Sequence, residues 1–86
     1  MKAIVKHWVY IIYSAKAARY YIGQTKDIEK RLIRHNGGDV QSTRPYRPWK
    51  LVYSELHSTR GEAVLRERHL KSPAGWRELK RLKQPG

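Results

Sequence analysis

The sequence predicts a small α+β domain, with a three-stranded antiparallel or mixed sheet flanked by helices in the order β-β-α-β-α-α. Three observations lead to this class. Two aromatic, apolar runs are separated by a short break, a third run alternates apolar and polar residues, and helix-capping signals follow the second and third runs. At 86 residues, the chain has room for one domain, spanning residues 1–86.

The first two runs, Trp8 to Ser14 and Arg19 to Gly23, are expected to pair as an antiparallel hairpin around a four-residue break. In this register Tyr10 faces Gly23 and lies diagonally beside Tyr21 on the same face of the sheet. Because glycine has no side chain, it leaves space next to Tyr10. Two phenols beside that gap predict a pocket.

A helix follows, capped at its start by Asp27 or Thr25 and ended by the pair Gly37-Gly38. Four of its residues share one stripe at helical spacing: Ile28, Arg31, Leu32 and His35. Arg31 and His35 stand one turn apart on a stripe that is normally apolar, within reach of the tyrosines. Either residue alone is also typical of a side chain that only shields the core. Combined with the two phenols, they predict a functional site.

The next segment, Asn36 to Pro48, is rich in Gly, Pro and polar residues and is expected to be a surface loop. In it Arg44, Tyr46 and Arg47 interleave cations with an aromatic ring, a mixture that suits phosphate contact and base stacking. A connector stiffened by its prolines fits this composition equally well.

The third run, Trp49 to Leu56, alternates apolar and polar residues and is expected to be the third strand. Strict alternation would place Leu51, Tyr53 and Glu55 on one face. Because an isolated hairpin is only marginally stable, this strand makes the sheet viable.

The second helix begins with a capping box, in which Thr59 and Glu62 satisfy each other's backbone amides. Ala63, Glu67 and Leu70 then share a stripe, so that a carboxylate lies on the face that docks on the sheet. An ion pair of Glu67 with a neighbouring arginine, such as Arg66 or Arg68, is the alternative to a functional role.

The chain closes with Ser72-Pro73, a cap followed by a first-turn proline. Trp76, Leu79 and Leu82 then predict a short amphipathic helix with cations on its outer face.

Charge dominates the composition. Nineteen Lys and Arg against seven Asp and Glu give a formal net charge of +12, which predicts a polyanionic partner, with nucleic acid favoured. A membrane surface is the weaker alternative, because the cations are not gathered opposite a bulky apolar face. The absence of cysteine excludes disulfides, thiolate zinc sites and cysteine nucleophiles. With no signal-peptide pattern and no run of about 18 apolar residues, a soluble, cytoplasmic protein is expected.

The triplets Trp8-Val9-Tyr10 and Tyr21-Ile22-Gly23, followed by Arg31 and His35, resemble the GIY-YIG nuclease domain, in particular its small stand-alone bacterial members. The first triplet lacks the glycine and isoleucine of the family name but keeps Tyr10. The resemblance extends to Leu70, because the sequence around Glu67 is similar to the family stretch whose glutamate binds the metal.

This resemblance implies an endonuclease that hydrolyses phosphodiester bonds in DNA. DNA repair is the expected role, and the sequence leaves recombination and defence open. The resemblance also implies that Tyr10 activates the water or its proton relay, that Tyr21 and His35 assist, and that Glu67 holds one divalent ion, Mg²⁺ or else Mn²⁺. Arg31, always protonated, suits a non-bridging phosphate oxygen. Nearby cations are expected to stabilise the Tyr10 phenolate. The asparagine that larger members carry after the glutamate has no counterpart, since Asn36 is the last asparagine.

Nucleic-acid contacts are expected from the residues Lys26, Arg34, Arg44, Tyr46, Arg47, Arg66 and Lys71. The sequence contains no recognisable base-reading element, so RNA stays open, and either relaxed specificity or a protein partner for targeting is expected. The alternative function is a nucleic-acid-binding module that keeps the nuclease fold and does not cut.

Overall fold

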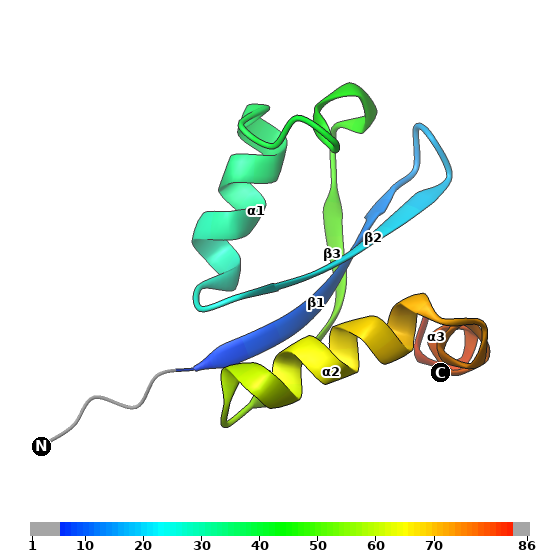
Figure 1. Ribbon diagram of the computed structural model, residues 1–86. Helices are drawn as coiled ribbons and strands as arrows, with labels where there is room; N and C mark the ends of the chain where they lie inside the picture. The colour runs from blue at the N-terminus through cyan, green and yellow to red at the C-terminus, as the bar shows by residue number, and fades with distance from the viewer. Residues whose placement is uncertain (1–5, 84–86) are drawn as a thin grey trace, which may run out of the picture.

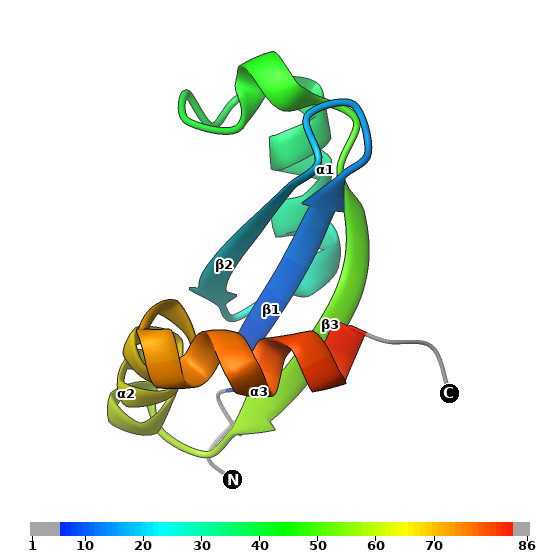
Figure 2. The same cartoon turned by 90° about the vertical axis from the view of Figure 1, so that its right-hand side faces the viewer.

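The computed structural model describes residues 6–83, without the side chains of residues 82 and 83. Its elements run in the predicted order: β1 (His7–Ser14), β2 (Arg19–Thr25), α1 (Ile28–Gly37), the 3₁₀ turn η1 (Arg44–Tyr46), β3 (Lys50–His57), α2 (Arg60–Lys71) and α3 (Pro73–Lys83). The strand order is β2-β1-β3, with both pairs antiparallel. Helix α1 lies on one face of the sheet and α2 and α3 lie on the other (Figures 1 and 2). The predicted α+β class is confirmed.

The central strand β1 is buried on both faces because helices cover both sides of the sheet. Val9 and Ile11 point toward α2 and α3 and form one core with Ile22, Ala63, Leu70 and Leu79. Tyr10 and Ile12 point toward α1 and form a second core with Trp49, Tyr21, Leu32, Tyr46 and Leu51. This alternation explains why β1 reads as a continuous apolar run.

The hairpin has the predicted register, in which Tyr10 faces Gly23 and Ser14 faces Arg19. Its loop places Ala18 in the left-handed region, at φ 51°. Ser14 is fully buried at the end of β1, where its hydroxyl accepts from the Ala17 amide at 3.2 Å and so fixes the turn.

A bulge in β3 corrects one expectation. Leu51 faces Ile12, but Tyr53 faces Ile11, so Val52 is the extra residue between them. Leu51 therefore packs in the core under α1, whereas Tyr53 packs in the core under α2 and α3. The prediction that Leu51, Tyr53 and Glu55 share one face is wrong, because the bulge reverses the alternation within the strand.

The caps of α1 are the predicted ones. The Asp27 carboxylate accepts from the Lys30 amide at 3.0 Å, and Gly38 ends the helix at φ 84°, a conformation that favours glycine. His35 is fully buried on the face toward the sheet, and Arg31 and Leu32 are half-buried beside it.

Helix α2 begins with one half of the predicted capping box, since the Thr59 hydroxyl accepts from the Glu62 amide at 3.1 Å. The Glu62 carboxylate accepts from the Ser58 hydroxyl. Ala63 and Leu70 are fully buried against the sheet.

Helix α3 starts at Pro73, as the sequence predicts, and the Ser72 hydroxyl accepts from the Gly75 amide at 3.2 Å. Leu79 is fully buried, whereas Trp76 is 46% exposed, so the apolar face of α3 is only partly covered. The predicted contribution of Leu82 lies outside the described side chains.

An ion-pair network joins α2, α3 and β3. The Arg66 guanidinium donates to Glu55 on β3 and to both carboxylate oxygens of Glu78 on α3. His69 contacts Glu78 at 3.0 Å. The bond to Arg66, followed by the one to His69, lowers the pKa of Glu78 to about 2. These contacts attach α2 and α3 to β3, the edge strand of the sheet.

Within residues 6–83, no helix combines the length and the apolar content needed to cross a bilayer.

Glycine 75 permits the tight turn between α2 and α3, which makes a substitution test possible. A Cβ at Gly75 would lie 1.8 Å from the His69 carbonyl oxygen, whereas a Cβ at Gly61 would meet only the Thr59 hydroxyl, at 4.0 Å. We expect Gly75→Ala to lower the free energy of unfolding by about 3 kcal/mol or more, because backbone has to move. Gly61→Ala is the control and should be neutral or stabilise by up to about 1 kcal/mol. Urea unfolding of both variants measures the difference, and equal midpoints would contradict this account of the turn.

Candidate active site

A chain of hydrogen bonds connects β1, α1 and the loop after α1. The Tyr10 hydroxyl and His35 Nε2 are 2.9 Å apart, and His35 Nδ1 lies 2.8 Å from Thr43 Oγ1. The Thr43 hydroxyl in turn donates to the Val40 carbonyl at 3.3 Å. All three side chains are at most 2% exposed.

The direction of this chain follows from its last bond. Because Thr43 donates its hydroxyl proton to Val40, its oxygen accepts from His35 Nδ1–H. A neutral imidazole with its proton on Nδ1 has an acceptor lone pair on Nε2, and Tyr10 O–H donates to it. The chain therefore aligns Tyr10 to give up a proton to His35.

Hydrogen bonds made by Asn36 and Trp49 hold the loop that carries Thr43 next to His35. The Asn36 amide makes two bonds across the loop, accepting from the Trp49 amide at 2.7 Å and donating to the Trp49 carbonyl at 3.0 Å. The Trp49 indole donates to the Thr43 carbonyl at 2.8 Å. The end of α1, the loop and the start of β3 are thereby held together around His35.

Tyr21 completes an aromatic cluster around the chain. Its ring centroid is 6.3 Å from Tyr10, 5.0 Å from His35 and 6.4 Å from Trp49. The open space predicted beside Tyr10 is instead filled by the Tyr10 side chain, since a Cβ on Gly23 would lie 2.6 Å from the Tyr10 hydroxyl. Gly23 is therefore required for the position of Tyr10.

Burial determines the protonation states in this cluster. Burial, together with the charges of Tyr21 and Glu67, raises the pKa of Tyr10 above its ordinary value, and Arg31 opposes this shift. Burial and the nearby Arg31 and Arg34 lower the pKa of His35. At neutral pH the structure thus holds a phenol and a neutral imidazole. Of the cations expected to stabilise the Tyr10 phenolate, Arg31 does lower the pKa of Tyr10, but burial outweighs it.

Glu67 reaches the same region from α2, on the opposite face of the sheet. Its side chain is only 20% exposed, and its charge is one of the influences on Tyr10. Its carboxylate forms an ion pair with Lys71 Nζ at 2.8 Å, rather than with the arginines considered from the sequence.

Glu67 offers a single carboxylate to a metal ion. Among the described residues, no three His, Cys, Asp or Glu side chains are grouped to hold a metal ion. A single carboxylate suits Mg²⁺, which keeps several waters and takes phosphate oxygens as further ligands. Glu67, oriented by α2 and half-buried beside the Tyr10 cluster, is the residue that could hold it.

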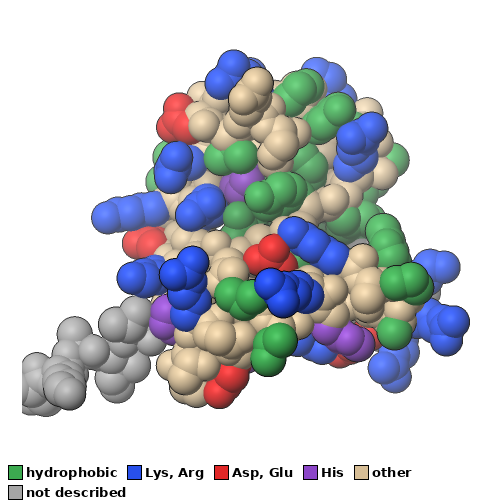
Figure 3. Space-filling model, viewed as in Figure 1, with side chains coloured by type: hydrophobic (Ala, Val, Ile, Leu, Met, Phe, Trp, Pro, Cys, Tyr) green, Lys and Arg blue, Asp and Glu red, His purple; other side chains and the backbone are tan. Residues whose placement is uncertain are grey.

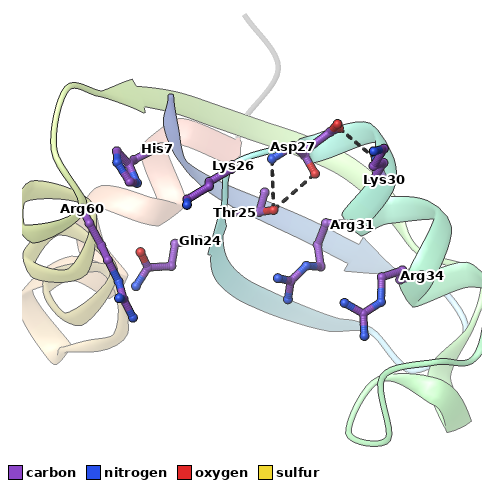
Figure 4. Close-up of a pocket in the computed structure, with 9 residues that line it drawn as sticks. All are labelled: His7, Gln24, Thr25, Lys26, Asp27, Lys30, Arg31, Arg34 and Arg60. Atoms are coloured by element: carbon purple, nitrogen blue, oxygen red, sulfur yellow. Dashed lines mark hydrogen bonds between the residues drawn. The ribbon is translucent and has the colours of Figure 1, made fainter. Parts of the chain in front are cut away.

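A first basic cleft opens beside this cluster, between β2, α1 and the start of α2 (Figure 4). It measures about 560 Å³ and is lined by His7, Gln24, Thr25, Lys26, Asp27, Lys30, Arg31, Arg34 and Arg60. Arg31 and Arg34 extend from α1, while Arg60 extends from α2 on the other side of the cleft (Figure 4). Arg31 therefore belongs both to the cleft and to the surroundings of Tyr10.

A second basic cleft lies at the other end of α1, lined by Lys16, Asn36, Arg44, Pro45, Arg47 and Pro48. Its two arginines are held by backbone oxygens, with Arg44 Nε 2.7 Å from the Gly38 carbonyl and Arg47 Nε 2.8 Å from the Arg44 carbonyl. Nearby, the Arg19 guanidinium covers one face of the Tyr46 ring at 4.4 Å, which removes that face from base stacking.

The structure brings together Tyr10, Tyr21, Arg31 and His35, and the charge of Glu67 reaches Tyr10 from α2. It places Lys26 and Arg34 in the first basic cleft and Arg44 and Arg47 in the second. Arg66 lies apart from both clefts in its ion-pair network, so its predicted contact with nucleic acid stays a prediction while its structural contacts are observed.

Sequence reasoning did not single out Thr43, Lys30 or Arg60. Lys30 and Arg60 carried no signal beyond their charge, because the cleft forms only when α2 packs beside β2. Thr43 follows an irregular loop, and no sequence period relates it to His35.

The surface around the site is strongly cationic. Figure 3 shows Lys and Arg side chains over α1 and over α2, with few acidic side chains among them. Such a surface attracts polyanions over distances of about a Debye length.

Comparison with known proteins agrees with this geometry. Residues 6–78 match the GIY-YIG catalytic domain. A UPF0213 protein of Staphylococcus saprophyticus is 42% identical over 76 residues, 87% of this chain and 92% of that protein. A UPF0213 protein of Staphylococcus epidermidis is 36% identical over 80 residues, 92% and 96% of the two chains.

A solved structure also matches. The solution NMR structure of a UPF0213 protein from Bacillus halodurans gives a TM-score of 0.55 at 31% identity, and the match covers 91% of this chain and 85% of that one. Its fold is similar over nearly the whole of both chains. From the domain match, the relatives and this structure together, the chain belongs to the GIY-YIG family, among its small UPF0213 proteins.

Proposed function

We propose that the protein is a metal-dependent endonuclease that hydrolyses phosphodiester bonds in DNA. The observation that carries the proposal is the aligned chain from Tyr10 through His35 to Thr43, with Arg31 and Glu67 beside Tyr10. Membership of the GIY-YIG nuclease family indicates that the substrate is a nucleic acid.

Proton transfer is the task that the chain supports. As the Tyr10 oxygen takes a proton from the attacking water, its own proton passes to His35 Nε2, which is 2.9 Å away. The resulting imidazolium keeps its Nδ1–H bond to Thr43. Because the imidazole is neutral beforehand, no external base is needed to prepare it. Tyr21, in contact with the His35 ring, helps to hold this geometry.

Two cations would neutralise the negative charge of the reacting phosphate. Arg31, which reaches the first basic cleft from α1, is placed to donate to a non-bridging oxygen. A divalent ion held by Glu67, Mg²⁺ or Mn²⁺, would neutralise phosphoryl charge and favour departure of the leaving oxygen. The protein contributes the fixed carboxylate and the buried surroundings that strengthen these interactions.

The two basic clefts suggest the path of the nucleic acid. They lie toward opposite ends of α1, a helix of ten residues and so about 15 Å long. That length corresponds to about four phosphates along one strand of a duplex. Lys26 would hold the strand on one side of Arg31, and Arg34, Arg44 and Arg47 on the other. With no base-reading element recognised, a protein partner would supply targeting.

A non-catalytic module is the second candidate, supported by the almost complete burial of Tyr10, which is 2% exposed. Such a module would use the same clefts without transferring protons. The two functions differ in their response to loss of Glu67.

Loss of Glu67 should separate these functions. We expect Glu67→Gln to reduce metal-dependent cleavage about 100-fold or more, with binding retained, because the carboxylate that holds the metal is removed. The assay uses labelled linear, nicked, flap, branched and single-stranded DNA and RNA, with Mg²⁺, Mn²⁺ or EDTA. Glu29→Gln, which removes an exposed carboxylate from α1, is the control and should cleave like the parent. Binding without cleavage by the parent under every metal condition would favour the module.

Acid should inactivate and destabilise the protein through His35. Its pKa in the folded state lies below the ordinary 6.5, so the unfolded chain takes up this proton first as the pH falls. The free energy of unfolding should therefore be unaffected by His35 above about pH 6.5 and should fall below it. The cleavage rate should fall over a lower range, where the folded imidazole becomes charged and no longer accepts from Tyr10.

Single-turnover rates and urea unfolding between about pH 5 and 8 measure the two effects. His35→Gln is the control for stability and should lose this part of the pH dependence. A cleavage rate that stays constant across the range would refute the relay.

Arg60 and Arg66 should behave differently toward nucleic acid. Arg60 lines the first basic cleft, so Arg60→Gln should lower the log-log salt slope of binding by about 0.9 on duplex DNA or about 0.7 on single strands. Arg66→Gln should leave the slope unchanged and lower the free energy of unfolding by about 1–3 kcal/mol, because Glu55 and Glu78 lose their partner. Titrations at several salt concentrations and urea unfolding provide the comparison. An equal fall in slope for Arg66→Gln would place Arg66 in the interface.

A further inference from the structure

Glu67 forms an ion pair with Lys71, which lies one helical turn further along α2. Lys71 Nζ lies 2.8 Å from Glu67 Oε2, and the Lys71 side chain is 52% exposed while that of Glu67 is 20% exposed. The carboxylate assigned to the metal thus already has a cationic partner. The inference below rests on the proposed function of Glu67.

This pair differs from the other carboxylate contacts on the same helical layer. Glu55 and Glu78 are held by the planar fork of Arg66, with each side chain no more than 27% exposed. Lys71 is a compact, strongly hydrated point charge on a flexible stem, and more than half of its side chain is in contact with solvent. We therefore expect the Arg66 contacts to persist, whereas Lys71 can leave Glu67 for another anion.

Lys71 also borders the active site on its other side. Its side chain lines a pocket of about 230 Å³ together with Tyr20, Tyr21, Ile22, Trp76 and Leu79. Since Tyr21 belongs to the cluster around His35, Lys71 lies close both to a residue of that cluster and to Glu67. A surface pair that served only to stabilise the helix would not need this position.

We propose that Lys71 is an exchangeable counter-ion of Glu67: its ammonium group neutralises the carboxylate before the metal binds and then moves to a phosphate of the substrate. A divalent ion and an ammonium group cannot share one carboxylate without strong repulsion, so one displaces the other. Lys71 therefore weakens metal binding in the absence of nucleic acid and strengthens nucleic-acid binding in its presence.

Metal binding provides the first test. We expect Lys71→Met to bind Mn²⁺ about two- to fivefold more tightly than the parent, the factor that corresponds to an exposed ion pair. Electron paramagnetic resonance of unbound Mn²⁺ measures this affinity with no nucleic acid present. The control is Lys80→Met, which removes the same charge from an exposed position on α3. Thermal melts establish that both variants are folded.

Nucleic-acid binding provides the second test. For the parent, adding metal should steepen the log-log salt slope of binding by about 0.7–0.9, as the displaced ammonium group gains a phosphate contact. Catalytic turnover is avoided with a non-hydrolysable phosphorothioate strand. Lys71→Met should show no such change, and Lys80→Met should respond like the parent.

The outcomes separate two kinds of failure. If Lys71→Met binds Mn²⁺ no more tightly than Lys80→Met, the exchange is refuted while the metal site stands. If Glu67→Gln binds Mn²⁺ as well as the parent does, the metal assignment itself fails, and the role of Lys71 fails with it. Tighter binding by Lys71→Met alone, lost again in the double variant with Glu67→Gln, supports the exchange.

Discussion

The buried chain from Tyr10 through His35 to Thr43 is the constraint on which this site depends. It connects the central strand, the first helix and the loop behind that helix through polar side chains that are almost completely excluded from solvent. In such surroundings an unpaired donor or acceptor is costly, so the three groups hold each other in one arrangement. The same bonds that keep α1 on the sheet also set the tautomer of His35, and stability and the proposed proton transfer therefore rely on the same atoms.

The two faces of the sheet differ in the side chains that they carry. The face toward α1 combines aromatic rings with the buried polar chain, and the clefts at both ends of α1 are cationic. The face toward α2 and α3 combines aliphatic packing with the ion pairs of Arg66. From this second layer, Arg60 lines the first basic cleft, and the charge of Glu67 influences the pKa of Tyr10.

Much of the fold could be predicted because its signals are local. The pairing of Tyr10 with Gly23, the caps at Asp27 and Gly38, and the start of α2 at Thr59 each depend on neighbours in sequence. The family motifs then indicated which side chains meet. The bulge at Val52 could not be predicted, since an extra residue in a strand leaves the alternating pattern intact while changing which face it describes. Nor could the role of Thr43 or Arg60, because each acquires its partners only when segments distant in sequence pack together.

The bulge in β3 also determines which face of the sheet each half of the strand serves. Trp49, Leu51, Tyr53 and Glu55 have the same parity, so in a regular strand they would all project to one side. The extra residue at Val52 lets the first two project toward α1 and the last two toward α2. It changes the face to which odd-numbered side chains project, between the half of β3 that anchors the loop around His35 and the half that anchors Arg66. Removal of Val52 would leave Leu51 paired with Ile12 and Tyr53 paired with Ile11 in a regular ladder, so both halves of the strand would keep their faces. The extra residue is therefore what reconciles the even spacing of these four side chains in the sequence with their contacts to both helical layers.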